Sequence, residues 1–174
     1  WMLKNGKLER AWRWDGDEEN PIVRSMGAHS MVTADVDGDG RDEVMLGSCM
    51  LDDNGTLLWS SGLGHSDKAY LCKLHPDREG MQVFMVSEPK KEDGRGVSVV
   101  DAATGKLIWS IGHTTYHVGD GMVTDFDPAH PGLECFASED RKGGSTDRYL
   151  LTADGKKLQV AQDEIPGCRN WIWW

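Results

Sequence analysis

The sequence predicts an all-β fold, a β-propeller built from repeated four-stranded antiparallel sheets, on three observations. Gly makes up 21 of the 174 residues, and the 8 Trp outnumber the 3 Phe and 3 Tyr together. Apolar residues alternate over strand-length stretches, with almost no helical periodicity. A turn signature returns at intervals of 49, 50 and 50 residues, with glycines at positions 6, 55, 105 and 155. Repeats of this length in an all-β chain are most simply the blades of a propeller.

The repeated turn marks a hairpin tip in each expected unit. Glycine suits such a tip because it adopts the positive φ that a Cβ would oppose. Trp59 and Trp109 follow their glycines by four residues, and each leads to a Gly-His pair. The regular spacing argues against the alternative, an ordinary β-sandwich. The turns read Asn5-Gly6-Lys7-Leu8, Asn54-Gly55-Thr56-Leu57, Thr104-Gly105-Lys106-Leu107 and Asp154-Gly155-Lys156.

We expect residues 1–174 to form one partial propeller domain. Units of about 50 residues fit the chain about three and a half times, whereas a closed ring needs about 4–8 blades. The chain also ends in the apolar run Trp171-Ile172-Trp173-Trp174, which is unsuited to contact with water. A longer parent chain is therefore expected, and its remaining blades are the expected partners of this segment.

The composition excludes several function classes. Lys and Arg number 19 against 29 Asp and Glu, and the net charge of -10 leaves no basic face for nucleic-acid phosphates. Apolar runs are far shorter than the roughly 20 residues of a membrane span. The first six residues lack the apolar core of a signal peptide. Without a Cys-x-x-Cys pair, the cysteines are expected to be free thiols packed as small hydrophobes, at Cys49, Cys72, Cys135 and Cys168.

The sharpest local motif is the acidic stretch 35–43, called the first loop below. Carboxylates at its positions 1, 3 and 5 project toward one centre when the following glycine permits a sharp turn. A carboxylate at position 9 and a main-chain carbonyl at position 7 complete a shell of hard oxygen donors, which suits Ca²⁺. A solvated acidic turn is the alternative. The expected ligands are Asp35, Asp37, Asp39, the carbonyl of Arg41, and Glu43.

Two later loops repeat this motif in weakened form. The third loop, 125–134, keeps Asp125, Asp127 and Glu134 and is expected to be a weaker metal site. The second loop, 73–82, has Lys73 where the first loop has Asp35, which argues against a metal ion there.

Histidines form a second candidate site. His29, His65 and His117 each precede one of the three loops by six to eight residues, so we expect them at equivalent places in successive blades. Asp67 lies two residues after His65, and strand alternation puts both side chains on one face. Glu88 and Glu139 end strands that are expected to correspond. A convergence of His29, His65, Asp67 and Glu88 would suit Zn²⁺ or Mn²⁺ on ligand chemistry alone, and hydrogen-bonded histidines are the alternative.

The chain resembles a known family at these motifs. The stretch from Ala28 to Glu43, the segment Gly62-Leu63-Gly64-His65-Ser66-Asp67 and the loop Pro76-Asp77-Arg78-Glu79-Gly80 resemble the bacterial rhamnogalacturonan lyases of polysaccharide lyase family eleven. The resemblance implies a secreted, periplasmic or cell-surface protein with an eight-bladed, calcium-rich propeller. It also implies an acidic polysaccharide substrate, the rhamnose–galacturonate backbone of pectin, cleaved by β-elimination. In that family the positions matching His29, His65, Asp67 and Glu88 look like ligands of one calcium ion, so the resemblance favours Ca²⁺ over softer metals.

One departure from the family bears on catalysis. The family usually carries Gly-Arg-Gly before the third loop, with the arginine in the substrate cleft, whereas this chain has Gly119-Asp120-Gly121. The groups near this triplet that could accept a proton near neutral pH are His117 and Tyr116. The main alternative function is a non-catalytic, calcium-dependent propeller that binds polysaccharide or protein. A weaker one follows from residues 99–109, which resemble the tryptophan-docking motif of quinoprotein dehydrogenases.

Overall fold

The computed structural model describes residues 1–19, 24, 27, 29, 31–140 and 144–165. All regular elements in this part of the chain are β-strands paired antiparallel, which confirms the all-β prediction. The apolar run at 171–174 and Cys168 lie outside the described residues. Across the described ranges, no helix has the length and apolar character needed to cross a membrane.

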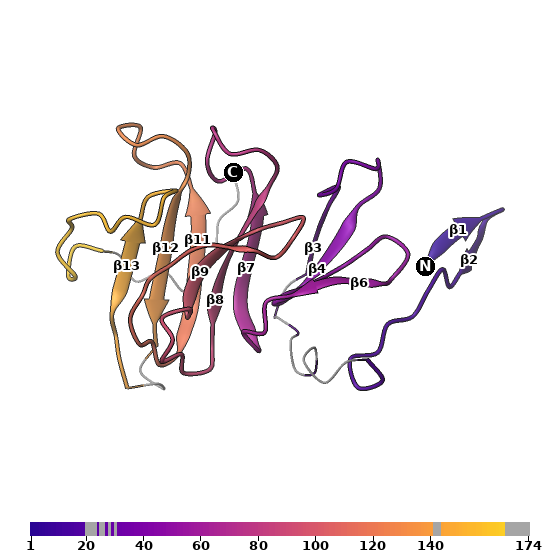
Figure 1. Ribbon diagram of the computed structural model, residues 1–174, viewed down its shortest axis with the longest axis horizontal. Coiled ribbons are helices and arrows are strands. Elements are labelled where there is room, and N and C mark those ends of the chain that lie inside the picture. Colours follow the sequence, from indigo (N-terminus) through magenta and orange to yellow (C-terminus); the bar gives the residue numbers. More distant parts are fainter. Residues whose placement is uncertain (20–23, 25–26, 28, 30, 141–143, 166–174) are drawn as a thin grey trace.

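The strands form four sheets, each made of strands consecutive in sequence. Figure 1 shows the sheets following one another along the long axis, with the N-terminal hairpin at one end and β13 at the other. The hairpin pairs β1 (Met2–Lys4) with β2 (Lys7–Glu9). The first four-stranded sheet contains β3 (Met31–Ala34), β4 (Glu43–Leu46), β5 (Cys49–Leu51) and β6 (Leu57–Ser60). The second contains β7 (Ser66–Cys72), β8 (Gln82–Ser87), β9 (Val97–Asp101) and β10 (Leu107–Ser110), and the three-stranded sheet contains β11 (Val118–Thr124), β12 (Glu134–Glu139) and β13 (Arg148–Leu151).

The second four-stranded sheet is covered on both faces, and strand β8 shows this directly. All six of its residues are buried. Val83 and Met85 belong to the apolar cluster shared with the first four-stranded sheet, whereas Phe84 and Val86 belong to the cluster shared with the three-stranded sheet. This alternation follows from the two-residue period of a strand. Burial of each such side chain contributes about 1.5–3 kcal/mol to the free energy of folding. The sheets are therefore stabilised mainly by packing against one another.

Three tryptophans join successive sheets by the same hydrogen bond. Each indole N–H donates to a main-chain carbonyl in a hairpin of the next sheet along the chain. Trp59 lies on β6 and Trp109 on β10, the last strands of their sheets, so the two tryptophans of the sequence repeat occupy equivalent places. Trp12, which follows the N-terminal hairpin, makes the same contact although its spacing from Gly6 differs. The bonds run from Trp12 to Asp53 (2.7 Å), from Trp59 to Ala102 (2.8 Å) and from Trp109 to Ala153 (2.8 Å).

The glycine of each contacted hairpin lets the indole ring approach the backbone. A Cβ added at Gly55, Gly105 or Gly155 would lie 2.5–2.6 Å from the nearest atom of the tryptophan ring, well inside contact distance. The three glycines also have φ between 68° and 86°. The recurring glycine therefore serves two needs at once, a left-handed turn residue and a flat surface for the tryptophan of the preceding sheet.

The candidate sites lie at the two ends of the first strand of each sheet. The three loops follow β3, β7 and β11, whereas His29, His65 and His117 precede the same strands. Strand β7 has 7 residues, which places its two ends roughly 20 Å apart. The histidine end and the loop end are therefore separate regions of the molecule.

The cysteine prediction is met at the positions that the structure describes. Cys49 and Cys135 are buried and Cys72 is partly buried, and all three are free thiols. Burial raises the pKa of Cys49 and of Cys72 to about 11, so these thiols stay protonated and unreactive near neutral pH.

Candidate metal centre

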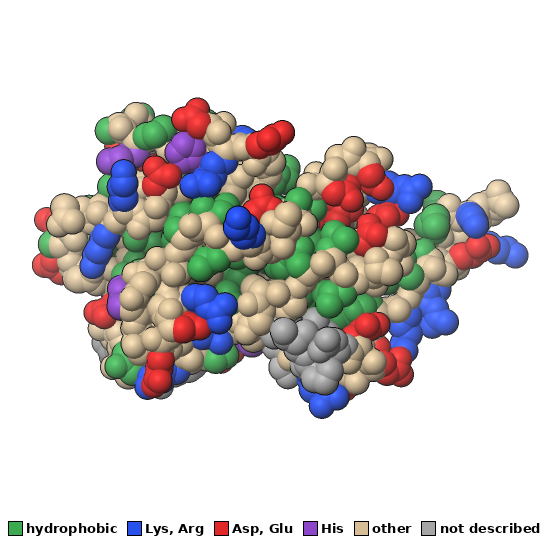
Figure 2. Space-filling model, viewed as in Figure 1, with side chains coloured by type: hydrophobic (Ala, Val, Ile, Leu, Met, Phe, Trp, Pro, Cys, Tyr) green, Lys and Arg blue, Asp and Glu red, His purple; other side chains and the backbone are tan. Residues whose placement is uncertain are grey.

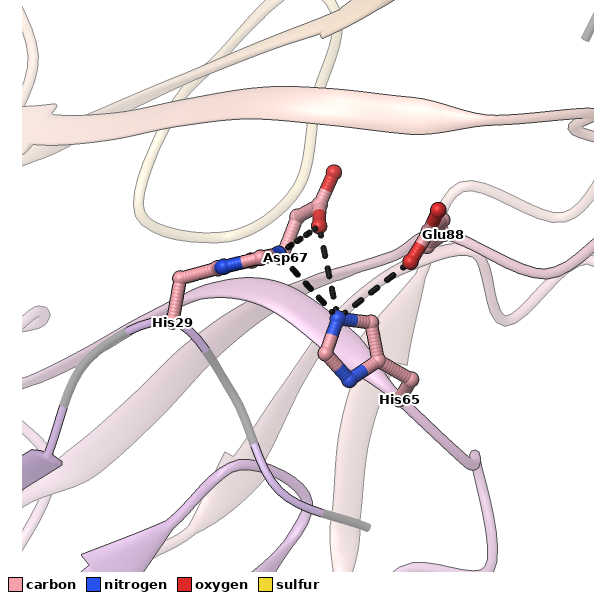
Figure 3. A group of neighbouring side chains, drawn as sticks. All are labelled: His29, His65, Asp67 and Glu88. Atoms are coloured by element: carbon pink, nitrogen blue, oxygen red, sulfur yellow. Dashed lines mark hydrogen bonds and ion pairs between the residues drawn. The ribbon is translucent and has the colours of Figure 1, made fainter. Parts of the chain in front are cut away.

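The structure brings together the four side chains expected at the histidine end of the strands. His29 precedes β3, His65 precedes β7, Asp67 lies on β7 and Glu88 directly follows β8, and Figure 3 shows the four pointing toward one another. One ligand atom from each lies within 4.8 Å of every other. We call His29, His65, Asp67 and Glu88 the four-residue cluster. It joins two neighbouring sheets, because His29 alone comes from the first.

The separations within the four-residue cluster match those of neighbouring ligands around one ion. The Nε2 atoms of His29 and His65 are 3.3 Å apart, and these atoms lie 3.2 Å and 3.6 Å from Oδ1 of Asp67. Nε2 of His65 is also 3.2 Å from Oε2 of Glu88. Two ligands about 2.4 Å from a cation and at right angles to each other are about 3.4 Å apart. The donor atoms therefore fit a single divalent cation.

The surroundings also favour a cation. Asp67 is 7% exposed, so its carboxylate is largely removed from water. Carboxylate oxygens of Asp67 and Glu88 lie within 4.8 Å of each other and repel when both are ionised. A divalent ion would neutralise this pair.

The strand register corrects the expected equivalence of the histidines. Ala34 pairs with Glu43, Cys72 with Gln82 and Thr124 with Glu134, and counting back from these pairs puts His29 at the place of Asp67 and Gly119. His65 and His117 are equivalent to each other, but His29 is not equivalent to them. The prediction was wrong because it treated separations of six and eight residues as equivalent. His29 lies six residues before the first loop, whereas His65 and His117 lie eight residues before the second and third loops. The pairing of β7 with β8 and of β11 with β12 is also irregular near Asp67 and Gly119.

The same register corrects the expected match between Glu88 and Glu139. The main-chain N–H of Glu88 donates to the carbonyl of His65 (3.3 Å), and that of Asp140 donates to the carbonyl of His117 (2.9 Å). Asp140 is therefore the equivalent of Glu88, and Glu139 is equivalent to Ser87, one position earlier. The shared Ser-Glu pattern of the two strands is thus displaced by one residue.

The two weak catalytic candidates occupy different environments. His117 is held between carboxylates: its Nε2 lies 3.0 Å from Oε1 of Glu88, and its Nδ1 lies 3.4 Å from Oδ1 of Asp140. Tyr116 is 43% exposed, and its ring lies under the ammonium of Lys90, 5.5 Å from the centroid. His117 thus borders the four-residue cluster, whereas Tyr116 faces solvent next to it.

The first loop is a compact acidic turn at the other end of the strands. Acidic side chains gather in Figure 2 where the loop between β3 and β4 lies in Figure 1. Ligand atoms of Asp35, Asp37 and Asp39 lie within 4.8 Å of one another. The carboxylates of all three also accept main-chain N–H groups of the loop, among them the Gly38 N–H at 2.7 Å from Asp35. The guanidinium of Arg41, expected to contribute only its carbonyl, pairs with Asp53 at 2.9 Å.

Glu43 is the buried end of the first loop. It is fully buried; its Oε2 accepts the main-chain N–H of Val36 at 2.7 Å, and its Oε1 has no hydrogen-bond partner. Burial raises the pKa of Glu43 above its usual value. Its carboxylate also lies within 4.8 Å of Asp37 and Asp52. An unpaired buried oxygen beside two further carboxylates is the environment that a calcium ion would complete. Sequence spacing gave no indication of Asp52, because it comes from the next turn of the chain.

The same structural position recurs in all three loops. The first residue of β4, β8 and β12 is Glu43, Gln82 or Glu134, each at most 1% exposed. Each side chain accepts main-chain N–H groups from the start of its own loop, at 2.7–3.2 Å. The buried acceptor is thus a constant part of the turn, and its charge is lost only in the second loop.

The second loop satisfies its own polar groups. The Lys73 ammonium donates to the main-chain carbonyl of Arg78. The amide nitrogen of Gln82 lies 3.1 Å from the carbonyl of Gly80. Lysine and amide hydrogens thus face loop carbonyls here, where the first loop gathers carboxylates.

The third loop contains the expected acidic residues, but their carboxylates do not lie together. Among the described residues, Asp125, Asp127 and Glu134 do not form a group whose ligand atoms all lie within 4.8 Å of one another. Asp127 instead pairs with His130 at 3.0 Å, and Oε1 of Glu134 is buried without a partner. This geometry is less suited to a metal ion than that of the first loop.

Comparisons with known proteins agree with this architecture. The family model described as "Rhamnogalacturonan lyase family 11, C-terminal domain" matches residues 1–174. Two curated relatives from Bacillus subtilis (strain 168) align over 99% of the chain: rhamnogalacturonan endolyase YesW, 39% identical, and rhamnogalacturonan exolyase YesX, 35% identical. The chain spans 26% and 28% of their lengths, respectively. The crystal structure of YesW superposes with a TM-score of 0.80 over 98% of this chain and 27% of that one, at 37% identity.

The match thus extends over the whole chain, including both candidate metal regions, and covers about a quarter of each relative. Four-stranded antiparallel sheets, the interlocking tryptophans and the motifs at both ends of the strands fall inside the matched range. The chain belongs to the family 11 rhamnogalacturonan lyases and corresponds to their C-terminal domain.

Proposed function

We propose that this chain is part of a calcium-binding β-propeller in a secreted or cell-surface polysaccharide lyase. The lyase would cleave rhamnogalacturonan, or a related uronate polysaccharide, by β-elimination. The observation that carries the proposal is the convergence of two imidazoles and two carboxylates in the four-residue cluster. Family membership supports the substrate class, because the relatives are named rhamnogalacturonan lyases.

Charge explains why such a protein needs a bound cation. The chain carries a net charge of -10 and would repel a polyanionic substrate. β-Elimination removes the weakly acidic C5 proton of a uronate and expels the 4-linked sugar. A calcium ion at the four-residue cluster would neutralise the uronate carboxylate and stabilise the negative charge that develops on it. Two carboxylates balance a divalent ion, which leaves the occupied cluster nearly neutral toward a third carboxylate.

The propeller is proposed from the repeated sheets and their connections. Each sheet packs on the next and is joined to it by a tryptophan, so the arrangement can continue in both directions. The remaining sheets, together with an arginine and a base for catalysis, would come from the rest of a longer protein.

The test uses the full-length protein that contains this chain. His65→Ala removes three of the short contacts of the four-residue cluster, those to His29, Asp67 and Glu88. His75→Ala is the matched control. His75 is a half-buried histidine facing a carboxylate in the second loop. Lyase activity is measured as absorbance near 235 nm on rhamnogalacturonan, and binding of a uronate oligosaccharide is measured by calorimetry. We expect His65→Ala to lower both, with His75→Ala unchanged; equal uronate affinity in the wild type and His65→Ala would contradict the proposal.

A second candidate function is a calcium-dependent propeller that binds polysaccharide without cleaving it. Asp120 favours it, because it stands where the family usually has the cleft arginine, and a carboxylate there would repel a uronate instead of pairing with it. Calcium-dependent binding of rhamnogalacturonan without any rise in absorbance near 235 nm would support this second function over the first.

A further inference from the structure

Glu88 is held between two histidines from neighbouring sheets. Its Oε2 lies 3.2 Å from Nε2 of His65, inside the four-residue cluster, and its Oε1 lies 3.0 Å from Nε2 of His117, outside it. The separation of Nε2 of His117 from this carboxylate oxygen is that of a hydrogen bond. Each carboxylate oxygen therefore has its own partner, and rotation about the last bond of Glu88 would break both contacts.

His117 is less exposed than the two cluster residues nearest to it. Its side chain is 13% exposed, against 31% for His65 and 40% for Glu88. The carboxylate of Glu139 accepts the main-chain N–H groups of Tyr116 at 2.8 Å and of His117 at 3.3 Å. Two main-chain bonds to one carboxylate hold the backbone from which the imidazole projects.

Glu139 is itself buried and anchored. It is 4% exposed, and its second oxygen accepts the hydroxyl of Tyr149 at 2.9 Å. Tyr149 is 2% exposed, and burial, followed by the hydrogen bond to Glu139, raises its pKa well above the usual range. A continuous chain of hydrogen bonds thus runs from the core of the three-stranded sheet to a carboxylate of the four-residue cluster.

We infer that His117 is a positioning residue for Glu88, which it orients as a metal ligand through a hydrogen bond to the oxygen that does not face the ion. The inference rests on the proposed metal site. Ligands of metal ions are commonly held by such outer partners, and loss of one lowers metal affinity by about 10- to 100-fold. His117 thereby receives a role different from proton abstraction, since Nε2 is occupied by Glu88.

The experiment measures calcium affinity of the full-length protein after removal of bound metal, by calorimetric titration. The site at the four-residue cluster is identified as the one lost in His65→Ala. We expect His117→Ala to weaken this site by about 10- to 100-fold. His117→Gln should restore most of the affinity, because its amide N–H occupies nearly the same position as Nε2. His75→Ala, a control of nearly equal exposure (12%), should bind as the wild type does.

A double-mutant cycle separates positioning from a general structural effect. In a Glu88→Ala background, His117→Ala should cause no further loss, because the group that it orients is already absent. An equal further loss in that background, or wild-type affinity in His117→Ala, overturns the inference. If His65→Ala removes no calcium site, the proposed metal site itself is wrong, and this outcome is distinct from failure of the positioning role.

Discussion

The contact between Trp59 and Gly105 gives a prediction whose magnitude follows from the structure. In Gly105→Ala the new Cβ would lie 2.5 Å from Cδ2 and 2.7 Å from Cε3 of the indole. The ring is 8% exposed and is held by its bond to the carbonyl of Ala102, so it cannot move without leaving its site. The substitution should therefore displace the tryptophan from the hairpin of the second four-stranded sheet.

The expected loss of folding free energy has one part from the backbone of the turn and one part from the displaced tryptophan. Placing alanine at a φ of 68° destabilises the turn by about 1–2 kcal/mol. Displacing the indole loses a hydrogen bond worth about 1 kcal/mol. Lost ring packing adds at least about 1 kcal/mol, since complete removal of a buried Trp side chain costs about 3–5 kcal/mol. The sum is about 3–4 kcal/mol, of which the backbone accounts for at most about half.

Gly80→Ala is the matched control, because Gly80 has the same φ of 68° and no atom within 4 Å of its added Cβ. Urea unfolding of the full-length protein should show a loss of about 1–2 kcal/mol for Gly80→Ala and about 3–4 kcal/mol for Gly105→Ala. In a Trp59→Ala background, Gly105→Ala should keep only the backbone part. Equal losses for the two alanine variants would refute the argument that the glycine is required by the tryptophan.

Three further predictions concern the first two loops and the partly buried Tyr70. Asp37→Ala should lower the melting temperature in calcium buffer and reduce the effect of EDTA to that of the ion at the four-residue cluster. An ion at 100 times its dissociation constant stabilises the folded state by about 2.7 kcal/mol; an unchanged wild-type melting temperature in EDTA would contradict this prediction. EDTA should speed amide hydrogen exchange at residues 36–42 and not at 74–81, since the Lys73 ammonium already satisfies the second loop; equal acceleration in both loops would show that the lysine does not substitute for an ion. Burial, and then the charge of Asp120, raises the pKa of Tyr70 to about 12 against an ordinary value of 10.0. The unfolded state therefore loses its proton first, stability should fall as the pH rises from about 10 to about 12, and Tyr70→Phe should make that decline shallower in pH-dependent urea unfolding.

Features set by local chemistry could be predicted from the sequence. The turn at Gly105 and its relatives follows from the conformational freedom of glycine, and the grouping of Asp35, Asp37 and Asp39 follows from their spacing within one turn. The convergence of His29 with His65 was also expected, although by an argument that was partly wrong. The two histidines lie close together because the sheets of β3 and β7 are neighbours. They occupy different, non-equivalent positions before these two strands.

Features set by strand pairing could not be predicted from spacing. The irregular pairing near Asp67 and Gly119 shifts the register of two strand pairs, and it leaves no mark in the local residue pattern. The pairing of Glu88 with His117 depends on that register and on the packing of two sheets. The contact of Trp12 was missed for a related reason, since its distance from the preceding glycine differs from that of Trp59 and Trp109.

The connecting tryptophans also set an order of events during synthesis of the chain. The donor and acceptor residues of the three bonds are 41, 43 and 44 positions apart, and the acceptor always comes later. At a translation rate of about 5–20 residues per second, each indole therefore waits about 2–9 s before its partner hairpin has been made. During that interval the newest sheet presents an uncovered aromatic side chain to chaperones or to other nascent chains. Slower translation would lengthen this exposure, whereas faster translation would shorten it.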